Sequence, residues 1–324
     1  MSLYDPASLN IVLYGAWFLK ISPNNRMLDR TLGPLFRMRI GEPQTGVQTA
    51  VQAEPASLVR METEPEDRIE RLELFELHSA VLPEPETRCV CVYLPECYES
   101  EPERHFPVFY LHDGQNLIDG RTSYIPGRTW RVGETADRMI AEGLVEPVIL
   151  VGVANTGLRR MAEYTPTKDF RMGGGDGKLY GRLLVEELKP HIDHEFRTLR
   201  GAVHTGLGGS SLGGLISLYL GLGHPETFGQ LAVMSPSIWW DHRSLLQFVK
   251  QARPRPETKI WLDIGTGEGM RHVRDTELLE RLLIQQGWRP GEDLQTLIVP
   301  DAVHDEDAWA ARFDQVLRFL FPAR

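Results

Sequence analysis

The chain has 324 residues, of which 42% are hydrophobic and 25% are charged, a composition typical of a globular protein. Its formal net charge of −10 repels polyanions, which argues against nucleic acid or an anionic membrane surface as a partner. No stretch approaches the roughly 18 apolar residues of a membrane helix. The first twenty residues lack the basic region and the clear cleavage site of a signal peptide. We therefore expect a cytoplasmic protein.

The chain has three cysteines, Cys89, Cys91 and Cys97, and this small, odd number argues against a disulfide framework. Cys89 and Cys91 alternate within CVCVYL, so they share one face of a predicted strand. We expect both to be buried there as small hydrophobic side chains.

Residues 1–70 differ from the rest of the chain, because they mix short apolar runs with turn residues and carry no recognisable motif. QTAVQA (48–53) and LVRMETE (58–64) alternate in the manner of short strands. We predict a β-rich N-terminal extension or an edge of the main sheet, with a role that the sequence does not indicate.

Residues 71–324 alternate between strand and helix patterns, which predicts a domain with an α/β fold. The predicted strands cover residues 71–79, 89–95, 106–114, 146–155, 204–211, 228–236, 259–267 and 294–304. The predicted helices cover residues 129–143, 180–196, 212–228, 275–288 and 306–321. Such an order favours a mostly parallel central sheet with helices on both faces. Ligands bind beyond the carboxyl ends of the strands in sheets of this kind.

The strongest motif is Gly209-Ser210-Ser211-Leu212-Gly213, a G-x-S-x-G pattern between a predicted strand and a predicted helix. In that setting the serine occupies a strained turn, and the flanking glycines let the backbone pass close by without a Cβ clash. The helix N-terminus that follows favours a developing negative charge. We predict Ser211 as the nucleophile, whereas Ser210 lacks the matching pair of glycines.

A serine hydroxyl is a weak nucleophile and needs an adjacent base that a third group orients. Enzymes with this motif carry the three groups in the chain order serine, acid, histidine. Of the ten histidines, His304 alone lies at the end of the last predicted strand segment and just before the last predicted helix. We predict that His304 is the general base, and the alternative is an exposed loop histidine.

The acid should follow the strand that contains KIWLDIG. Glu268 lies in the glycine-rich loop Gly265-Thr266-Gly267-Glu268-Gly269, just past the end of that strand, and is the preferred candidate. Two alternatives stay open, Asp275 and Asp263. Asp275 also suits the N-cap of the next helix, and Asp263 lies inside the strand. A serine–histidine pair without a direct acid is the remaining alternative.

An oxyanion hole needs two backbone N–H groups. Leu212, directly after the nucleophile, supplies one, and we choose Gln115, in the loop that follows FPVFYL, for the other. Gly114 allows an unusual backbone conformation in that loop. His112 and Asp113 precede the serine in the chain, so we interpret them as residues that hold the loop.

Two further patterns suggest metal or phosphate binding but match no complete motif. His191, His194 and Glu195 share the end of an amphipathic helix without the spacing of a zinc site. The segment GTGEG (265–269) lacks the Lys-Ser/Thr pair of a phosphate-binding loop. We therefore expect no metal and no organic cofactor.

Several segments occur together and in order after residue 71: VYLPECY, FPVFYLHDGQN, TWRVGETADRMIAEG, VGVANTGLRRMAEYTP, GSSLGGLISLYLGLGHPETFG, SPSIWW, WLDIGTGEG and VHDEDAW. Through them the chain resembles the esterases related to the enterochelin (ferric siderophore) esterases, within the α/β-hydrolase superfamily. More distantly it is similar to the S-formylglutathione hydrolases and the mycolyltransferases. The resemblance implies Ser211 as nucleophile, His304 as base, Glu268 as acid and Gln115 in the oxyanion hole.

The resemblance also implies the walls of a substrate pocket, formed by Arg and Trp side chains. These residues are Arg128, Trp130, Arg159, Arg160, Trp239 and Trp240. Arginine suits catecholate or carboxylate groups, and tryptophan suits aromatic rings. The alternative is that they are structural, for example Arg160 in an ion pair with Glu163 and Trp239 in the core.

The sequence therefore predicts a serine esterase that acts on a small-molecule ester, such as a siderophore trilactone or a similar aryl or acyl ester. An acyltransferase with the same three residues is one alternative, and a hydrolase-fold binding protein without turnover is another. Neither the natural ester nor the oligomeric state follows from the sequence.

Overall fold

The computed structural model describes residues 56–62, 64, 69–82, 87–252 and 258–323. All of them belong to the unit that runs from residue 54 to residue 324. The predicted strand QTAVQA and most of the predicted extension lie outside the described residues.

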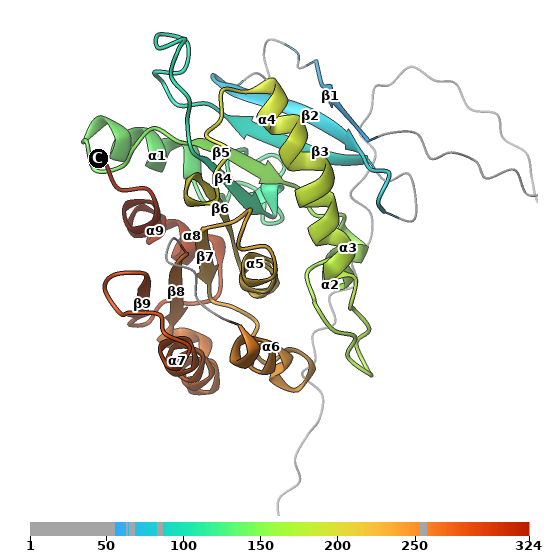
Figure 1. The fold of residues 1–324 in the computed structure, drawn as a ribbon, viewed down its shortest axis with the longest axis vertical. Helices are drawn as coiled ribbons and strands as arrows, with labels where there is room; N and C mark the ends of the chain where they lie inside the picture. The colour runs from blue at the N-terminus through green and yellow to red at the C-terminus, as the bar shows by residue number, and fades with distance from the viewer. Residues whose placement is uncertain (1–55, 63, 65–68, 83–86, 253–257, 324) are drawn as a thin grey trace, which may run out of the picture. The chain divides into compact units, whose positions relative to one another are not determined.

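The centre of this unit is a nine-stranded sheet with the order β1-β2-β3-β5-β4-β6-β7-β8-β9 (Figure 1). The strands are β1 (Ser57–Arg60), β2 (Leu72–His78), β3 (Thr87–Tyr93), β4 (Val108–His112), β5 (Ile149–Val153), β6 (Thr205–Ser210), β7 (Gln230–Met234), β8 (Lys259–Gly265) and β9 (Leu294–Val299). Strands β1, β2, β3 and β5 pair antiparallel, and all pairs from β5 through β9 are parallel. The described part of the predicted extension, β1, is thus an edge strand of the main sheet.

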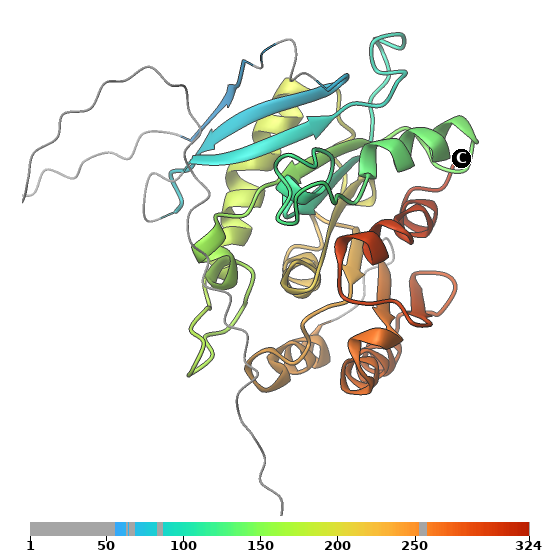
Figure 2. The same ribbon diagram turned by 180° about the vertical axis from the view of Figure 1, so that it is seen from behind.

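Helices cover both faces of the sheet, which confirms the predicted fold class (Figures 1 and 2). The helices are α1 (Val132–Ala141), α2 (Arg160–Glu163), α3 (Gly177–Arg182), α4 (Lys189–Glu195), α5 (Leu212–Gly223), α6 (Trp240–Gln251), α7 (Met270–Gln285), α8 (Glu306–Ala310) and α9 (Phe313–Leu320). Apolar side chains of α4, α5, α6 and α7 form the core on one face. Those of α1 and α9 form the core on the other face. Burial of both faces explains why the central strands are nearly continuous apolar runs.

The helices differ from the predicted ranges at several points. The predicted helix 180–196 contains a π-helical stretch, Leu183–Leu188, between α3 and α4. The predicted helix 306–321 is interrupted between α8 and α9. Helix α6 was not predicted, although Leu245, Leu246 and Val249 give it a buried stripe at helical spacing.

The prediction that Cys89 and Cys91 are buried is wrong, because Cys89 is exposed and Cys91 is only half-buried. Their shared face is as expected, but the face of β3 that packs into the core is the opposite one, which carries Val90 and Val92. Cys89 lies opposite Glu76 of β2 on the outer face. Alternation defines the two faces of a strand, but it does not say which one the helices cover.

Three residues with strained backbone lie at the carboxyl ends of parallel strands. Asp113 after β4, Ser211 after β6 and Ser235 after β7 have φ values of 57°, 59° and 41°. Positive φ is uncommon for residues other than glycine, and such strain concentrates at functional sites. These three residues therefore mark the edge of the sheet where a site is expected.

Candidate active site

Ser211 occupies a sharp turn between β6 and α5, with φ 59° and ψ −121°. Its N–H donates to the carbonyl of Met234 at 3.0 Å, which ties the turn to β7. A Cβ on Gly214 would lie 2.8 Å from the Met234 oxygen, and one on Gly209 would lie 3.1 Å from the backbone of Gly213. The first approach leaves no room for a Cβ at Gly214, directly after the motif, and the second is tighter than most Cβ contacts, so the packing of this turn favours glycine at Gly209.

His304 lies in the loop between β9 and α8, where its Nδ1 is 2.6 Å from Oε2 of Glu268. Glu268 lies just past β8, and its carboxylate is buried. Burial acts to raise the pKa of Glu268, but hydrogen bonds from His304, Ser235 and Gly265 outweigh it and hold the pKa below its usual value. The pair therefore consists of an ionised carboxylate and a histidine that donates to it through Nδ1.

The two alternative acids have other partners. Asp263 is buried inside β8, where it accepts hydrogen bonds from the side chain of Arg312 and the N–H of Ser235. Asp275 lies in the second turn of α7 and pairs with Arg243 at 2.8 Å, so its interpretation as an N-cap is wrong. Of the three acids that the sequence offered, Glu268 is the one that bonds His304.

A cavity of about 220 Å³ opens between these groups. Its walls are Ser211, Ser235, Pro236, Ser237, Trp239, Ile264, Glu268, His272 and His304. The structure thus brings together four residues that the sequence nominated: Ser211, Glu268, His304 and Trp239.

Ser237 and His272 line the same cavity and were missed by the sequence analysis. The Ser237 hydroxyl lies 3.3 Å from the Ser211 hydroxyl, within hydrogen-bond distance. Its place directly after β7, at the carboxyl edge, was the available signal. His272 lies near the start of α7, which begins five residues earlier than predicted.

The loop after β4 packs against the turn that carries Ser211. A Cβ on Gly213 would lie 3.5 Å from the Asp113 carboxylate. Gly114 is required here, because a Cβ would lie 2.5 Å from the backbone carbon of Gly152 in β5. Gln115 follows, and its side-chain oxygen accepts from the N–H of Asn155 at 3.2 Å. The backbone of Gln115 is therefore held beside the nucleophile's turn.

Leu212 is the first residue of α5, so its N–H has no partner within the helix. Helix N-termini attract negative charge, and this one begins directly after Ser211. The N–H groups of Leu212 and Gln115 stay the predicted donors of an oxyanion hole.

Arg160, predicted to bind substrate, instead makes a bidentate ion pair with Asp113, with both contacts at 2.7 Å. Asn155 donates to the same carboxylate at 2.6 Å. Burial acts to raise the pKa of Asp113, but the Arg160 guanidinium outweighs it and holds the pKa below its usual value. His112 is buried against Tyr180, and burial lowers the pKa of His112 to about 3. These groups hold the loop, as the sequence analysis interpreted His112 and Asp113.

Two of the predicted pocket tryptophans lie in the core. Trp130 is 2% exposed and packs on Trp309 and Phe313, and Trp240 is fully buried with its indole N–H donating to Thr167. Neither lines the cavity. The sequence pattern identified large aromatic residues near the site, but it did not distinguish residues that line the cavity from residues of the hydrophobic core.

The two remaining predicted arginines lie among acidic side chains. Arg128 is exposed and lies 3.6 and 3.4 Å from the carboxylates of Asp305 and Asp307. Arg159 lies 4.0 Å from both Glu163 and Asp176. The predicted pair of Arg160 with Glu163 is replaced by a buried pair of Glu163 with Arg88 at 2.8 Å.

His191 and His194 point to separate partners, since His191 bonds the Glu187 carbonyl and His194 bonds Glu195. Within the described ranges, no group of three or more His, Cys, Asp or Glu side chains is placed to hold a metal ion. In that same part of the chain, no helix combines the length and the apolarity that crossing a bilayer requires.

Comparison with known proteins gives a family. The family model described as "Putative esterase" matches residues 84–320. The "Uncharacterized protein YbbA" of Bacillus subtilis is 25% identical over 243 residues, which are 71% of this chain and 91% of that protein. The "Ferri-bacillibactin esterase BesA" of the same organism is 25% identical over 234 residues, 63% of this chain and 76% of the relative.

The crystal structure of the BES protein from Bacillus cereus superposes with a TM-score of 0.64 at 23% identity, covering 81% of this chain and 99% of that one. At that identity the likeness concerns the fold, and it agrees with the mostly parallel sheet described above. The family match spans strands β3 to β9, the turn at Ser211 and the loops of Glu268 and His304. The chain belongs to this esterase family and is a carboxylic ester hydrolase with the α/β-hydrolase fold.

Proposed function

We propose that the chain hydrolyses a carboxylic ester through an acyl-enzyme on Ser211, with His304 as general base and Glu268 as the acid that orients it. The observation that carries the proposal is the shared cavity. Ser211 on its strained turn lines the same space as His304, whose other ring nitrogen is held by Glu268 at 2.6 Å. A nucleophile, a base and an orienting acid in this relation form the arrangement that activates a serine hydroxyl.

In the first step His304 takes the proton of Ser211 as the hydroxyl oxygen attacks the ester carbonyl. The N–H groups of Leu212 and Gln115 receive the negative charge that develops on the carbonyl oxygen. The protonated His304 then gives its proton to the departing alcohol, which leaves the acyl group on Ser211. A water molecule, deprotonated by His304, attacks the acyl group, and His304 returns the proton to the Ser211 oxygen as the acid departs.

The substrate class follows from the walls of the cavity and from the relatives. Trp239 offers an aromatic face to an aryl group, and Ser237 and His272 offer hydrogen bonds. One relative is named a ferri-bacillibactin esterase. We propose a siderophore trilactone or a similar aryl or acyl ester, whose ferric ion, where present, would arrive with the substrate.

The test is hydrolysis of p-nitrophenyl acetate and butyrate by the wild type, Ser211→Ala and His304→Ala. We expect wild-type turnover and a loss of about 10⁴-fold or more in kcat in both variants. Ser217→Ala is the matched control, because it removes a buried hydroxyl that donates only to a carbonyl inside α5. It should retain wild-type kcat.

Covalent labelling by a fluorophosphonate reports the activated serine directly. A wild type without turnover and without label would overturn the proposal and favour a hydrolase-fold binding protein. Product analysis with added alcohols separates hydrolysis from acyl transfer, because an acyltransferase would yield the new ester in place of the free acid.

A further inference from the structure

A network of buried polar side chains contacts the oxygen of Glu268 that does not bond His304. Ser235 donates to this oxygen, Oε1, at 2.6 Å, and the backbone N–H of Gly265 donates to it at 3.0 Å. Behind Ser235 lie Arg312 and Asp263, both almost fully buried. The mechanism above assigns these three side chains no role.

The direction of the Ser235 hydroxyl is fixed by its neighbours. Arg312 Nη2 lies 2.8 Å from the hydroxyl oxygen, and the indole nitrogen of Trp309 lies 3.1 Å from it. Guanidinium and indole N–H groups can only donate, so together they occupy both acceptor positions of the hydroxyl. The hydroxyl proton must then point to Oε1 of Glu268.

The two donors on Oε1 of Glu268 determine which ring nitrogen of His304 carries the proton. With Oε1 of Glu268 engaged by two donors, Oε2 is the oxygen that accepts from His304. An ionised carboxylate is only an acceptor, so the proton of the neutral imidazole lies on Nδ1. Nε2 is then unprotonated and can act as the base.

We propose that Ser235 and Arg312 are positioning residues, which fix the Glu268 carboxylate and through it the tautomer and orientation of His304. This inference rests on the proposed function, because it gives the network a part in activating Ser211.

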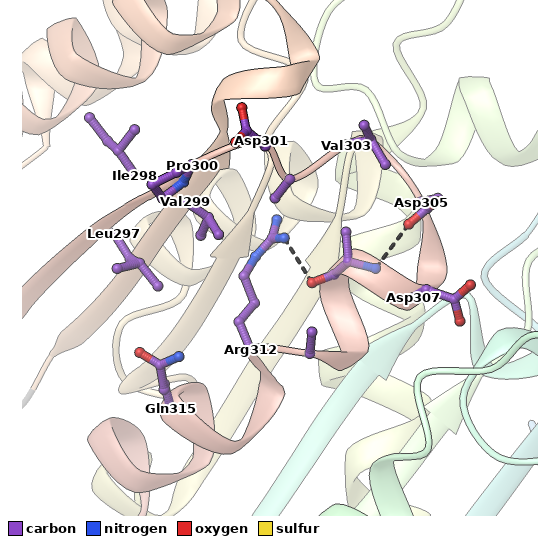
Figure 3. A pocket seen from close by; sticks show the side chains of 13 residues that line it. Leu297, Ile298, Val299, Pro300, Asp301, Val303, Asp305, Asp307, Arg312 and Gln315 are labelled. Carbon is purple, nitrogen blue, oxygen red and sulfur yellow. Dashed lines mark hydrogen bonds between the residues drawn. The ribbon is translucent and has the colours of Figure 1, made fainter.

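Arg312 is itself anchored on three sides. Besides Ser235, its guanidinium donates to Asp263 at 2.8 Å and to the carbonyl of Ala308 in α8 at 2.9 Å. Figure 3 shows the side chain extending toward α8 and lining a groove beside the residues that lead to His304. Asp263 in turn accepts from the indole of Trp261 at 2.7 Å. The network therefore links β8, the Glu268 loop and α8, the elements that adjoin Glu268 and His304.

The charges of the network suit the same role. Arg312 lies 2.8 Å from Asp263 and 4.0 Å from Glu268, so one guanidinium serves two carboxylates. One negative charge stays unbalanced while His304 is neutral. Protonation of His304 during attack by Ser211 balances it, and the imidazolium is thereby stabilised.

The experiment is a double-mutant cycle on p-nitrophenyl acetate with Ser235→Ala, Glu268→Ala and both together. Because one hydrogen bond to the acid is lost, Ser235→Ala should lower kcat about tenfold and leave KM unchanged. The double variant should match Glu268→Ala within about twofold, since Ser235 acts through Glu268. A full further tenfold loss in the double variant, or an unchanged kcat in Ser235→Ala, would overturn the proposal.

Thr198→Val is the matched control, because Thr198 is another buried hydroxyl that donates to a carboxylate, Asp193, at 2.7 Å. It should keep wild-type kcat. Ser235→Gly repeats the test without a side chain at φ 41°, in case the alanine variant fails to fold.

Proton NMR separates this inference from the proposed function. A low-field resonance from the Nδ1 proton of His304 should be present in the wild type and absent in His304→Ala. It should shift or exchange faster in Ser235→Ala. If the wild type neither hydrolyses esters nor takes the fluorophosphonate, the proposed function fails. An unchanged resonance in Ser235→Ala would overturn the positioning role itself, whatever the activity.

Discussion

Two pairs of arginine and carboxylate support the loops around Ser211, and they differ in how the guanidinium meets its acids. At the end of β4, the half-buried Arg160 makes a bidentate pair with Asp113. Beside β8, the buried Arg312 lies between Asp263 and Glu268. The first guanidinium joins one carboxylate through two short hydrogen bonds, and the second faces two carboxylates, one of which bonds His304.

The pKa values of Asp113 and Asp263 are shifted in opposite directions. Arg160 overcomes burial at Asp113, so the pKa of Asp113 is lowered. At Asp263 burial outweighs the shared Arg312 and the N–H donors, so the pKa is raised. A bidentate pair thus stabilises a loop, whereas a shared arginine leaves part of its attraction for a second acid. We therefore expect the first pair to act on stability and the second to act also on the base.

The sharpest test of this contrast is removal of each arginine in turn. Arg160→Met and Arg312→Met should each lower the free energy of unfolding by about 3–5 kcal/mol, because each leaves a buried carboxylate without its cation. Only Arg312→Met should move the acid limb of the kcat/KM profile, toward higher pH, because Arg312 lies 4.0 Å from the carboxylate that holds His304. Urea unfolding and a pH–rate profile measure the two effects.

Arg312→Lys is the matched control, because it keeps the charge while losing the planar fork that contacts Ser235 and Asp263. Its acid limb should stay in place. An equal shift of the limb in Arg160→Met would show that the two pairs do not differ in their action on His304.

The pH dependence of stability should have opposite signs at the two aspartates. Asp113 has a lowered pKa in the folded state, so its contribution is present above about pH 4, the unfolded value, and is lost as pH falls through the folded pKa. Asp263 has a raised pKa, so its contribution is present below about pH 4 and is lost as pH rises through the folded pKa.

Unfolding of Asp113→Asn and Asp263→Asn between pH 3 and pH 7 measures this difference. The stability gap between wild type and Asp113→Asn should widen as pH rises by ~1–3 kcal/mol, and the gap for Asp263→Asn should narrow. Two gaps that move in the same direction would contradict the assignment of one arginine to two acids.

The sequence predicted the alternation of strands and helices because both leave periodic apolar patterns. It also selected Ser211, Glu268 and His304, since each lies in the segment that follows a strand of a parallel sheet, and the structure places all three around one cavity. Local order along the chain was enough to locate these loops.

The supporting residues could not be predicted in this way. Arg312 belongs to the start of α9, and its partners are Ser235, directly after β7, and Asp263, inside β8. Such contacts depend on the three-dimensional crossing of elements. The same limit explains Arg160, whose partner Asp113 is 47 residues away, and Trp130, which faces the core.

A smaller effect is expected where the first pair meets the oxyanion loop. Gly114→Ala would place a Cβ 2.5 Å from backbone atoms of β5, which cannot move aside as a flexible side chain does. We expect a loss of ~1–3 kcal/mol in stability from this overpacking. A displaced Gln115 N–H should also lower kcat about tenfold or more.

Gly143→Ala, at a glycine with open space around its Cβ position, is the comparison, although its φ of 67° carries some strain of its own. It should lower stability without lowering kcat. A Gly114→Ala protein with wild-type kcat would argue against a role for the Gln115 N–H in holding the oxyanion.

The smallest effect is expected at Arg128, which lies outside both pairs. Its guanidinium is 48% exposed and lies 3.4 and 3.6 Å from two aspartates, beyond ordinary hydrogen-bond length. An exposed pair of this kind contributes about 0–1 kcal/mol, so Arg128→Ala should hardly change the urea midpoint.

If Arg128 meets an anionic part of the substrate, KM should rise for a carboxylate-bearing ester and stay constant for p-nitrophenyl butyrate. Arg182→Ala, at an exposed pair with Glu186 on α3, controls for the loss of a surface charge. Equal KM values for both esters in Arg128→Ala would remove this residue from the substrate site and leave it as a surface partner of α8.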